Sequence, residues 1–300
     1  MLSGRVRGNE VSVRVAYQGE PGAFSEAAVL RLLPDADPRP YPTFDEVFDA
    51  VSNGSVTLGV VQIENSIGGS IHRNYDLLVE RDLSIVGEVQ LPVVHNLLAL
   101  PGVALHDVKR VLSHPQALAQ CAKFLRGLEH VEAIATYDTA GSAKMVRDEQ
   151  RRDTAAIASE RAGTLFGLES LRSGIQDYDD NITRFLAISR QRVPLGTPDK
   201  TSVVFTLKSA PGALFKALSV FALRDIDLSK LESRPVAGRP WEYLFYLDVA
   251  AAREDLQCAR AMVHLAEFAP SLRTLGSYPR WREPTEVAES APVQEGARRG

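Results

Sequence analysis

The chain has 300 residues, 45% of them apolar and 24% charged, and its formal net charge is -4. These values are those of an ordinary globular protein of about two domains, and they exclude the basic surface that a nucleic-acid partner would need. The two cysteines lie far apart without a metal-binding spacing, and no run approaches the ~18 apolar residues of a membrane helix. We therefore expect a soluble, cytoplasmic protein that uses no metal or cofactor and binds neither nucleic acid nor membrane.

Apolar strand-like runs and amphipathic helices alternate through the first half of the chain. The clearest helix begins at Thr43, which forms a capping box with Glu46, and its apolar side chains recur at a helical spacing until Gly54. The alternation predicts an α/β fold with a largely parallel sheet. The segment 83–100 has no helical period, so we expect an extended crossover there. Strands are expected at 11–16, 56–63, 108–112, 131–136 and 154–158, and helices from the turn at 19–22 to 33 and at 43–54, 115–128, 139–149 and 159–167.

The pattern changes after residues 191–200, whose prolines and glycine predict a linker between a first domain at 12–190 and a second domain at 201–278. The second domain has the order βαββαβ of a ferredoxin-like fold. Its strands are expected at 201–207, 228–236, 241–249 and 271–277, its helices at 213–223 and 254–268, and a turn at 237–240. Residues 282–300 are polar and lack apolar periodicity, so we expect a disordered tail.

Two polar segments, 62–66 and 181–185, adjoin apolar strands although they lie more than a hundred residues apart. In α/β proteins, ligands meet polar side chains at strand ends and in the loops beyond them. The two segments would bring a hydroxyl, a carboxylate, an amide and a guanidinium to one cleft. This set suits binding a small anion and donating hydrogen bonds to a leaving oxygen. Because the net charge is negative, we expect arginine to be placed locally for such an anion.

Each of these side chains has a functional and a structural interpretation. Thr183 is expected to donate a hydrogen bond to the leaving oxygen, but a β-branched residue also suits a strand. Glu64, buried and protonated, is a candidate acid, or it accepts backbone N–H groups of the following loop; Asn65 stands beside it at the strand end. Arg184 could bind a carboxylate bidentately, although strand alternation places it opposite Thr183 and it could instead brace a loop.

The loop after residue 65 and the start of a later helix supply further candidates. Ser66 and Gly69 are expected to contact the substrate, because a glycine-rich turn lets backbone amides approach an anion. Ser113 and Gln120 bracket a helix start with proline in its first turn, where free amides could also meet an anion. The alternative is that Ser113 only caps this helix.

Six motifs stand in the order found in prephenate dehydratase and in its plant relative, arogenate dehydratase. They occupy residues 16–25, 64–78, 113–121, 155–159, 183–185 and 232–235. The chain resembles this family over nearly its whole length. The resemblance implies a catalytic domain of two lobes, built like a type-2 periplasmic binding protein, and a C-terminal ACT domain that binds an amino acid. It also implies a carbon–oxygen lyase that converts prephenate to phenylpyruvate in phenylalanine biosynthesis, with Thr183 essential.

The resemblance further implies feedback regulation by L-phenylalanine, bound between two subunits of a homodimer or homotetramer. The residues carried over for this site are Gly212, Ala213, Leu214, Glu232, Ser233, Arg234 and Pro235. Two alternatives stay open: an arogenate dehydratase, which the segment 68–78 favours, and a non-catalytic amino-acid sensor. No transit peptide precedes the first strand, which favours prephenate as substrate, and the retained Thr183 and Glu64 argue against the sensor.

Overall fold

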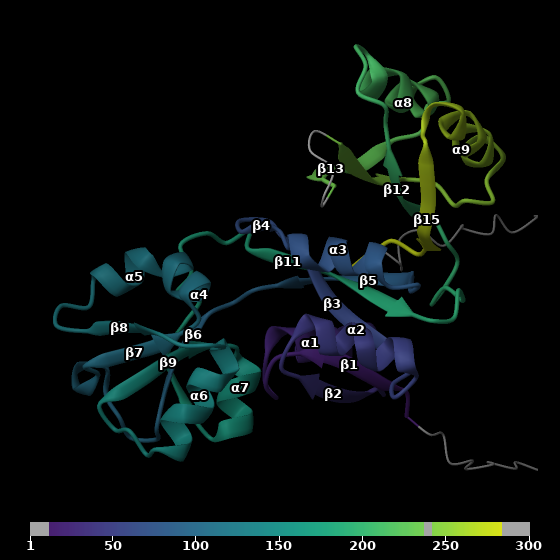
Figure 1. Cartoon of the computed structure of the whole chain (residues 1–300). Coiled ribbons are helices and arrows are strands. Elements are labelled where there is room, and N and C mark those ends of the chain that lie inside the picture. Colours follow the sequence, from purple (N-terminus) through teal and green to yellow (C-terminus); the bar gives the residue numbers. More distant parts are fainter. Residues whose placement is uncertain (1–11, 237–241, 284–300) are drawn as a thin grey trace, which may run out of the picture.

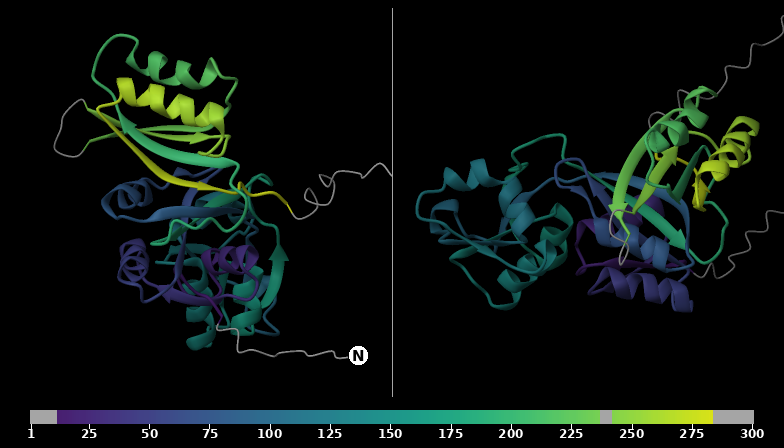
Figure 2. Two further views of the ribbon diagram at one scale, coloured as in Figure 1. Left: turned by 90° about the vertical axis from the view of Figure 1, so that its right-hand side faces the viewer. Right: turned by 45° about the horizontal axis from the view of Figure 1, so that its top comes forward.

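The structure, a computed structural model, describes residues 12–236 and 242–283, which form three β-sheets. The first lobe lies between the second lobe and the C-terminal domain (Figure 1, Figure 2). The turn expected at 237–240 and the tail expected after residue 283 lie outside the described residues. Within the described ranges, no helix has the length and apolar character needed to cross a membrane.

The sheet of the first lobe has the strand order β2-β1-β3-β11-β5, with β4 paired to β3. Strands β1, β2 and β3 run parallel, whereas β11 is antiparallel to both β3 and β5. Helix α1 covers one face of this sheet, and α2 and α3 cover the other. The elements are β1 (Arg14–Gln18), α1 (Phe24–Leu32), β2 (Asp37–Tyr41), α2 (Phe44–Asn53), β3 (Leu58–Asn65), β4 (Gly69–Ser70), α3 (His72–Glu80), β5 (Ser84–Pro92) and β11 (Ile182–Ser189).

Helix α2 forms as predicted because both of its ends are capped. The Thr43 hydroxyl accepts a hydrogen bond from the Glu46 N–H at 3.2 Å, and Gly54 ends the helix in the left-handed conformation with φ of 82°. These caps satisfy backbone groups that a helix cannot pair internally.

The sheet of the second lobe has the order β10-β6-β9-β7-β8. The helix expected at 115–128 is interrupted at Cys121, because Asp177 accepts from the Lys123 N–H at 3.0 Å and its own N–H donates to the Gln120 carbonyl. This tertiary contact starts a new helix within the expected one. The elements are β6 (Asn96–Ala99), η1 (Leu105–Asp107), β7 (Arg110–Ser113), α4 (Pro115–Gln120), α5 (Ala122–Arg126), β8 (Glu132–Ala135), α6 (Thr139–Asp148), β9 (Thr154–Ala158), α7 (Glu160–Phe166) and β10 (Glu169–Ser173).

Two crossings of the chain connect the lobes. The first runs from β5 to β6, so the extended crossover predicted at 83–100 is confirmed, and the second returns through 174–181 to β11. The two-lobed α/β architecture is therefore confirmed. The parallel sheet was predicted only in part, because each lobe contains antiparallel pairs where the chain crosses over.

The C-terminal domain has the predicted βαββαβ order and the antiparallel strand order β13-β14-β12-β15. Helices α8 and α9 cover one face of the sheet, and the other face packs on the first lobe, where Tyr246 donates a hydrogen bond to the Tyr75 carbonyl at 2.9 Å. The two domains therefore share one core. The elements are β12 (Lys200–Thr206), α8 (Ala213–Ala222), β13 (Leu228–Pro235), β14 (Tyr243–Val249), α9 (Leu256–Phe268) and β15 (Ser271–Tyr278).

The segment after β15 returns to the first lobe. The Trp281 N–H donates to Glu88 at 2.9 Å, Arg282 pairs with Asp199 at 2.6 Å, and Glu283 pairs with Arg31 at 2.6 Å. The expectation that disorder begins at residue 282 is wrong for residues 282 and 283, because these ion pairs hold them.

Candidate active site

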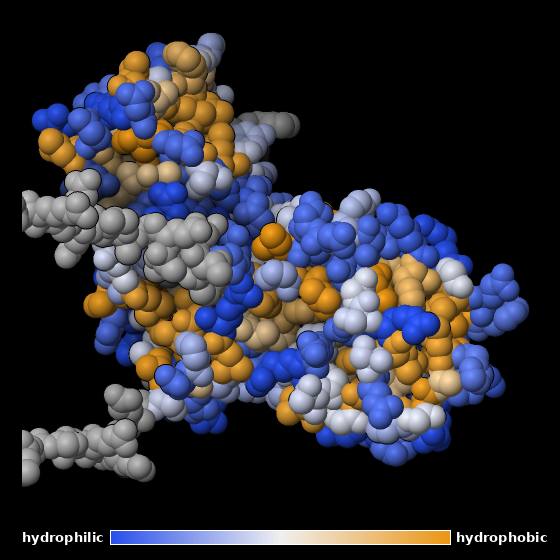
Figure 3. Space-filling model, turned by 180° about the vertical axis from the view of Figure 1, so that it is seen from behind, coloured by the Kyte–Doolittle hydropathy of each residue, from blue (hydrophilic) through white to orange (hydrophobic). Residues whose placement is uncertain are grey.

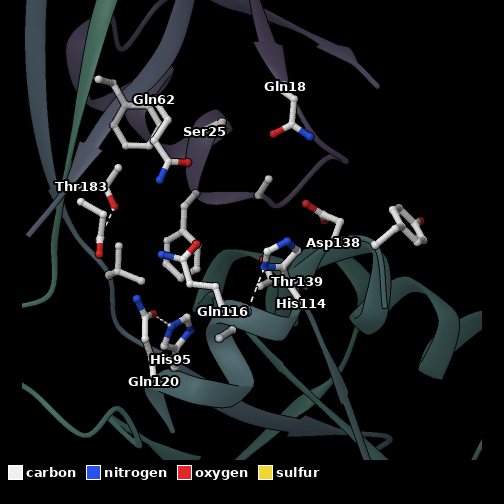
Figure 4. Close-up of a pocket in the computed structure, with 17 residues that line it drawn as sticks. Gln18, Ser25, Gln62, His95, His114, Gln116, Gln120, Asp138, Thr139 and Thr183 are labelled. Atoms are coloured by element: carbon white, nitrogen blue, oxygen red, sulfur yellow. Dashed lines mark hydrogen bonds between the residues drawn. The ribbon is translucent and has the colours of Figure 1, made fainter. Parts of the chain in front are cut away.

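A cleft of about 160 Å³ lies between the two lobes (Figure 4). Both lobes contribute amide, hydroxyl and aromatic side chains to it, and its lining includes three of the residues predicted from the sequence, Asn65, Gln120 and Thr183. The other lining residues are Gln18, Ala23, Phe24, Ser25, Gln62, Val93, His95, His114, Gln116, Ala117, Tyr137, Asp138, Thr139 and Phe185.

A β-bulge in β3 determines which side chains face the cleft. Thr183 is paired with Asn65 across the strands, but Phe185 is paired with Gln62, so β3 contains one extra residue. Gln62 and Asn65 therefore both line the cleft although they are three positions apart, while Thr183 and Phe185 keep the ordinary alternation of β11. Bulges next to active sites commonly redirect side chains in this way.

The Asn65 amide orients the Thr183 hydroxyl. The Asn65 Oδ1 accepts from the backbone N–H groups of Ile67 at 3.1 Å and Gly68 at 2.7 Å, so the Nδ2 must point toward Thr183. That Nδ2 donates to the Thr183 Oγ1 at 3.0 Å, and both side chains are buried. Since an amide nitrogen only donates, the Thr183 hydroxyl keeps its own hydrogen for an acceptor in the cleft.

A second set of hydrogen bonds joins this pair to the other lobe. The Asn65 Nδ2 also donates to Asn181 at 2.7 Å, and the Asn181 Nδ2 donates to the Gln120 Oε1 at 3.0 Å. The same Gln120 oxygen lies 2.9 Å from the His95 Nε2, which must therefore be the protonated ring nitrogen. Burial lowers the His95 pKa, which keeps the ring neutral. The Gln120 amide nitrogen is left for the cleft (Figure 4).

The lining residues provide donors for an anion but no cationic side chain of lysine or arginine. The N-terminal ends of α1, at Phe24 and Ser25, and of α6, at Thr139, border the cleft. Helix N-termini favour anions through their free amides and their dipole. No arginine lines the cleft among the described residues, so the expected local arginine is not found there, and helix ends and amide side chains are the donors that the cleft offers.

Arg184 faces away from the cleft, as strand alternation predicts. Its guanidinium lies 2.6 Å from Asp248 of β14 and 2.7 Å from Glu88 of β5, and only 12% of its side chain is exposed. The expected contact between Arg184 and a substrate carboxylate is corrected by this geometry, because the ion pairs direct the guanidinium into the contact with the C-terminal domain. These ion pairs agree with the alternative interpretation, in which Arg184 braces a neighbouring segment.

Glu64 also faces the C-terminal domain, where its carboxylate lies 2.9 Å from the Lys230 Nζ in β13. A carboxylate paired with a lysine outside the cleft is not placed to deliver a proton to a ligand in it. The role of Glu64 as the acid is therefore corrected, since the extra residue in β3 turns Glu64 and Ile63 to the same side.

Three further candidates lie beside the cleft and do not line it. The Ser66 hydroxyl donates to the Asp180 carbonyl at 2.6 Å and holds the loop against the crossing segment. Ser113 is fully buried and donates to the Ile157 carbonyl at 2.7 Å, so the helix cap is His114, whose Nδ1 accepts from the Gln116 N–H. Gly69 lies in β4 and has a φ of 76°, a conformation that favours glycine.

The residues proposed for an amino-acid site in the second domain are divided between two faces. Alternation along β13 turns Glu232 and Arg234 toward the first lobe, where they bond Ser70 at 2.7 Å and Asp76 at 2.6 Å. Ser233 and Pro235 are exposed. Gly212 caps α8 in the left-handed conformation with φ of 73°, and Ala213 and Leu214 begin that helix.

The sequence interpretation missed most residues that the second lobe contributes. Asp138 and Thr139 stand at the start of a helix that was predicted, and an acidic residue before an apolar helical pattern signals a helix cap. His95 carried no comparable signal, because a crossing segment places it, and Gln62 lay in the polar segment 62–66 but reaches the cleft together with Asn65 only through the bulge.

Comparison with known proteins agrees with these features. A family model described as prephenate dehydratase matches residues 15–193. The chain is 50% identical over 282 residues to arogenate dehydratase/prephenate dehydratase 2, chloroplastic, of Arabidopsis thaliana, covering 90% of this chain and 74% of that protein. It is 50% identical over 283 residues to arogenate dehydratase 2 of Petunia hybrida, covering 89% and 72%.

Two solved structures are similar over most of the chain. Prephenate dehydratase from Arthrobacter aurescens in complex with L-Phe has a TM-score of 0.82 and 33% identity, covering 94% of this chain and 92% of that chain. GqqA, described as a novel type of quorum quenching acylase, has a TM-score of 0.83 and 36% identity, covering 91% and 99%.

The relatives also correct the expected location. The cytoplasmic prediction is contradicted by the Arabidopsis relatives, which are named chloroplastic. It depended on the lack of a recognisable leader at the start of the chain, and that is no evidence of where the protein acts.

Proposed function

Because this chain belongs to the prephenate dehydratase family, we propose that its cleft catalyses the decarboxylating dehydration of a cyclohexadienyl substrate, with prephenate giving phenylpyruvate. The observation that carries this proposal is the Thr183 hydroxyl, which lines the cleft and accepts a hydrogen bond from the Asn65 amide, so that its own hydrogen remains available to a ligand. No other lining hydroxyl is held by a donor-only amide in this way among the described residues.

The reaction requires one proton and two bond cleavages. The ring carboxylate leaves as carbon dioxide, its electron pair enters the ring, and the 4-hydroxyl leaves with a proton as water. Thr183 donates a hydrogen bond to the departing oxygen, which stabilises the charge that develops there. Formation of the aromatic ring drives the reaction, so the protein chiefly has to bind and position the substrate.

The cleft offers different surroundings to the two carboxylates of prephenate. Amides at the starts of α1 and α6 favour a carboxylate that is retained. Phe24, Phe185 and Val93 line the cleft as well, and an apolar surface does not solvate the carboxylate that leaves.

Arogenate, which has an ammonium group where prephenate has a keto group, is the second candidate substrate. The relatives of 50% identity carry arogenate dehydratase in their names, which supports this candidate. The choice between the two depends on which group in the cleft meets the side chain of the substrate.

Two other activities fit the cleft less well. An acylase such as the one named among the similar structures needs a nucleophile activated by a base. The Asn65 amide donates to Thr183 and cannot take its proton, so the Thr183 hydroxyl is not activated for attack. A non-catalytic sensor would not need this oriented hydroxyl.

We also propose that L-phenylalanine regulates the enzyme through the C-terminal domain and that the protein forms a homodimer or homotetramer. The similar Arthrobacter protein binds L-Phe. Four large apolar side chains are exposed on helices α8 and α9 and at the residue that follows α8. Figure 3 shows apolar surface on this domain. These side chains are Phe215, Leu223, Leu256 and Val263. They suit association with a second copy.

The test is an assay of the purified protein with prephenate and with arogenate, following phenylpyruvate and phenylalanine, with and without added L-phenylalanine. Turnover of at least one substrate by the wild type, and its loss in Thr183→Val, would support the proposal. A folded wild-type protein that converts neither substrate would refute it.

A further inference from the structure

Asp138 is the one acidic side chain among the described residues that line the cleft. It lies at the start of α6, and its Oδ1 caps that helix by accepting from the Gly141 N–H at 2.8 Å. Asn, Ser or Thr would cap a helix equally well without adding a negative charge. Capping therefore does not explain why a carboxylate stands in a cleft built for an anionic substrate.

Among the described residues, no lysine or arginine forms an ion pair with Asp138, and the favourable charge acting on it is that of the cleft residue His114 when that ring is protonated. Burial is the largest cause that raises its pKa above the usual value, Glu20 adds to this, and the Gly141 and Ala140 amides and the charge of His114 oppose it. The nearby Lys144 is already paired with Glu20 at 3.1 Å. A half-buried carboxylate in this position is unfavourable alone and favours a cation supplied from the cleft.

The shape of the substrate relates Asp138 to Thr183. In prephenate and arogenate the leaving hydroxyl and the three-carbon side chain are attached at opposite ends of the ring. Thr183 and Asp138 lie on opposite sides of the cleft (Figure 4). If Thr183 meets the leaving hydroxyl, which rests on the function proposed above, Asp138 meets the side chain.

We infer that the Asp138 carboxylate binds the side-chain ammonium of arogenate and disfavours the keto acid prephenate, so that the amino acid is the preferred substrate. Arogenate carries two carboxylates and one ammonium, and with one proton it yields zwitterionic phenylalanine, carbon dioxide and water. The α-carboxylate of its side chain is then next to the amides that begin α6, while the ammonium faces the Asp138 oxygen that the cap leaves unused.

The experiment compares kcat/KM for arogenate and for prephenate in the wild type, Asp138→Asn and Asp138→Ser. Both substitutions keep a good helix cap, so the fold of α6 is retained. A hydrogen bond to a charged group is lost for arogenate, and the ratio of arogenate to prephenate efficiency should fall about tenfold to a hundredfold. Efficiency toward prephenate itself should rise, because a repulsive charge is removed.

Asp148→Asn is the matched control, since Asp148 lies at the other end of α6 and pairs with Arg147 on the surface. It removes the same charge from the same helix and should leave the ratio unchanged. Thermal unfolding of all variants shows whether the cap is kept, and Asp138→Ser replaces Asp138→Asn if the latter does not fold.

Two results would overturn the inference. One is a wild type that prefers prephenate, and the other is a ratio that both Asp138 variants leave within about twofold of the wild type, well below the effect of a lost charged hydrogen bond. Either result leaves the dehydratase function intact, because the wild type is then still active. A wild type inactive on both substrates is the separate outcome that refutes the function.

Discussion

The hydroxyl of Thr183 and the amide of Asn65 act as one unit, because the amide fixes the direction in which the hydroxyl can donate. Thr183→Val keeps the shape of the side chain and removes only the donor. We expect kcat to fall by about 10²- to 10³-fold, the usual effect of losing one donor to a developing oxyanion. The measurement is steady-state kinetics beside thermal unfolding. Full activity in a normally folded variant would assign Thr183 to strand packing.

The direction of the Asn65 to Thr183 hydrogen bond gives a second prediction. Asn65→Asp is isosteric, but its oxygen would accept the Thr183 hydrogen and turn it away from the cleft. The loss of activity should approach that of Thr183→Val, although the Thr183 hydroxyl is still present. Asn53→Asp, an exposed isosteric change at the end of α2, should leave activity as it is. Equal activity in Asn65→Asp and the wild type would contradict the proposed orientation.

Single site residues could be predicted from the sequence where they lie at the end of an apolar strand. Asn65 ends one apolar strand, Thr183 lies at the start of another, and Gln120 follows a helix start, so their places could be inferred. Glu64 and Arg184 share these strands, but the sequence did not show that a second domain would bind their charges. Asp138 and the other residues of the second lobe reach the cleft only through the fold.

At the level of elements, strands β3 and β11 serve two purposes on their two faces. Asn65 and Thr183 face the cleft, while Glu64 and Arg184, which are paired across the same strands, face the C-terminal domain. A shift in the pairing with that domain would therefore act on the same two strands that carry Asn65 and Thr183, the pair proposed to act in catalysis. The ion pairs of Arg184 should also matter for stability.

Arg184→Met tests the stability of these ion pairs. Removing Arg184 leaves the buried Asp248 without its ion-pair partner, whereas Glu88 keeps Lys200, and breaking a buried pair typically costs about 3–5 kcal/mol. We expect this loss in the free energy of unfolding from chemical denaturation. Arg192→Met is the control, because Arg192 is 73% exposed and pairs with Asp82 at 3.5 Å, so the cost should be small. Equal stabilities of the two variants would contradict the prediction.

The pH dependence of stability also tests the ion pair between Arg184 and Asp248. Burial alone would raise the pKa of Asp248, but the charge and hydrogen bond of Arg184, the Ser202 hydrogen bond and the charge of Lys200 together lower the net pKa. A carboxyl whose pKa is lowered by folding stabilises the protein above its unfolded pKa, and this is lost as the pH falls toward the folded value. Acid should therefore destabilise the wild type more than Arg184→Met. In that variant Arg184 no longer lowers the pKa of Asp248 against the effect of burial. Parallel pH profiles of unfolding would exclude this contribution.

Helices and strands were predicted well where the local sequence signals were strong, and poorly where tertiary contacts determine whether an element forms or where it ends. Helix α2 has both of its caps in the sequence, and its bounds agree with the prediction. Strand β2 contains Pro38 and Pro40, which read as loop, and it forms because it is an edge strand paired only with β1. The break between α4 and α5 depends on Asp177, which is distant in sequence.

At the scale of the whole molecule, the C-terminal domain is packed against the first lobe and is not a separate module. The complete βαββαβ order suggested a module joined by a linker, and the sequence did not show that both faces of its sheet are covered. The linker residue Leu195 donates its N–H to the Val86 carbonyl at 2.8 Å, and the buried Glu88 binds Lys200 at 2.8 Å and the backbone of Trp281. The C-terminal domain is thus part of the core of the first lobe.

The last prediction follows from this shared core. Ending the chain after Pro198 removes Lys230, Asp248 and Lys200, which pair with Glu64, Arg184 and Glu88, and it exposes the apolar face around Tyr75. The pair between Arg184 and Glu88 remains. The apolar surface shared with the C-terminal domain then returns to water, at about 25 cal/mol per Å², so the melting temperature should fall by about 10 °C or more. We expect the truncated protein to lose activity even without phenylalanine, as measured by calorimetry, gel filtration and the prephenate and arogenate assays.

Phe215→Ser, on the exposed surface of α8, is the comparison that should alter self-association and leave the melting temperature of the subunit nearly unchanged. A truncated chain as stable and active as the full chain would show that the two domains are independent, because the contact between them would then contribute nothing to the stability of the first.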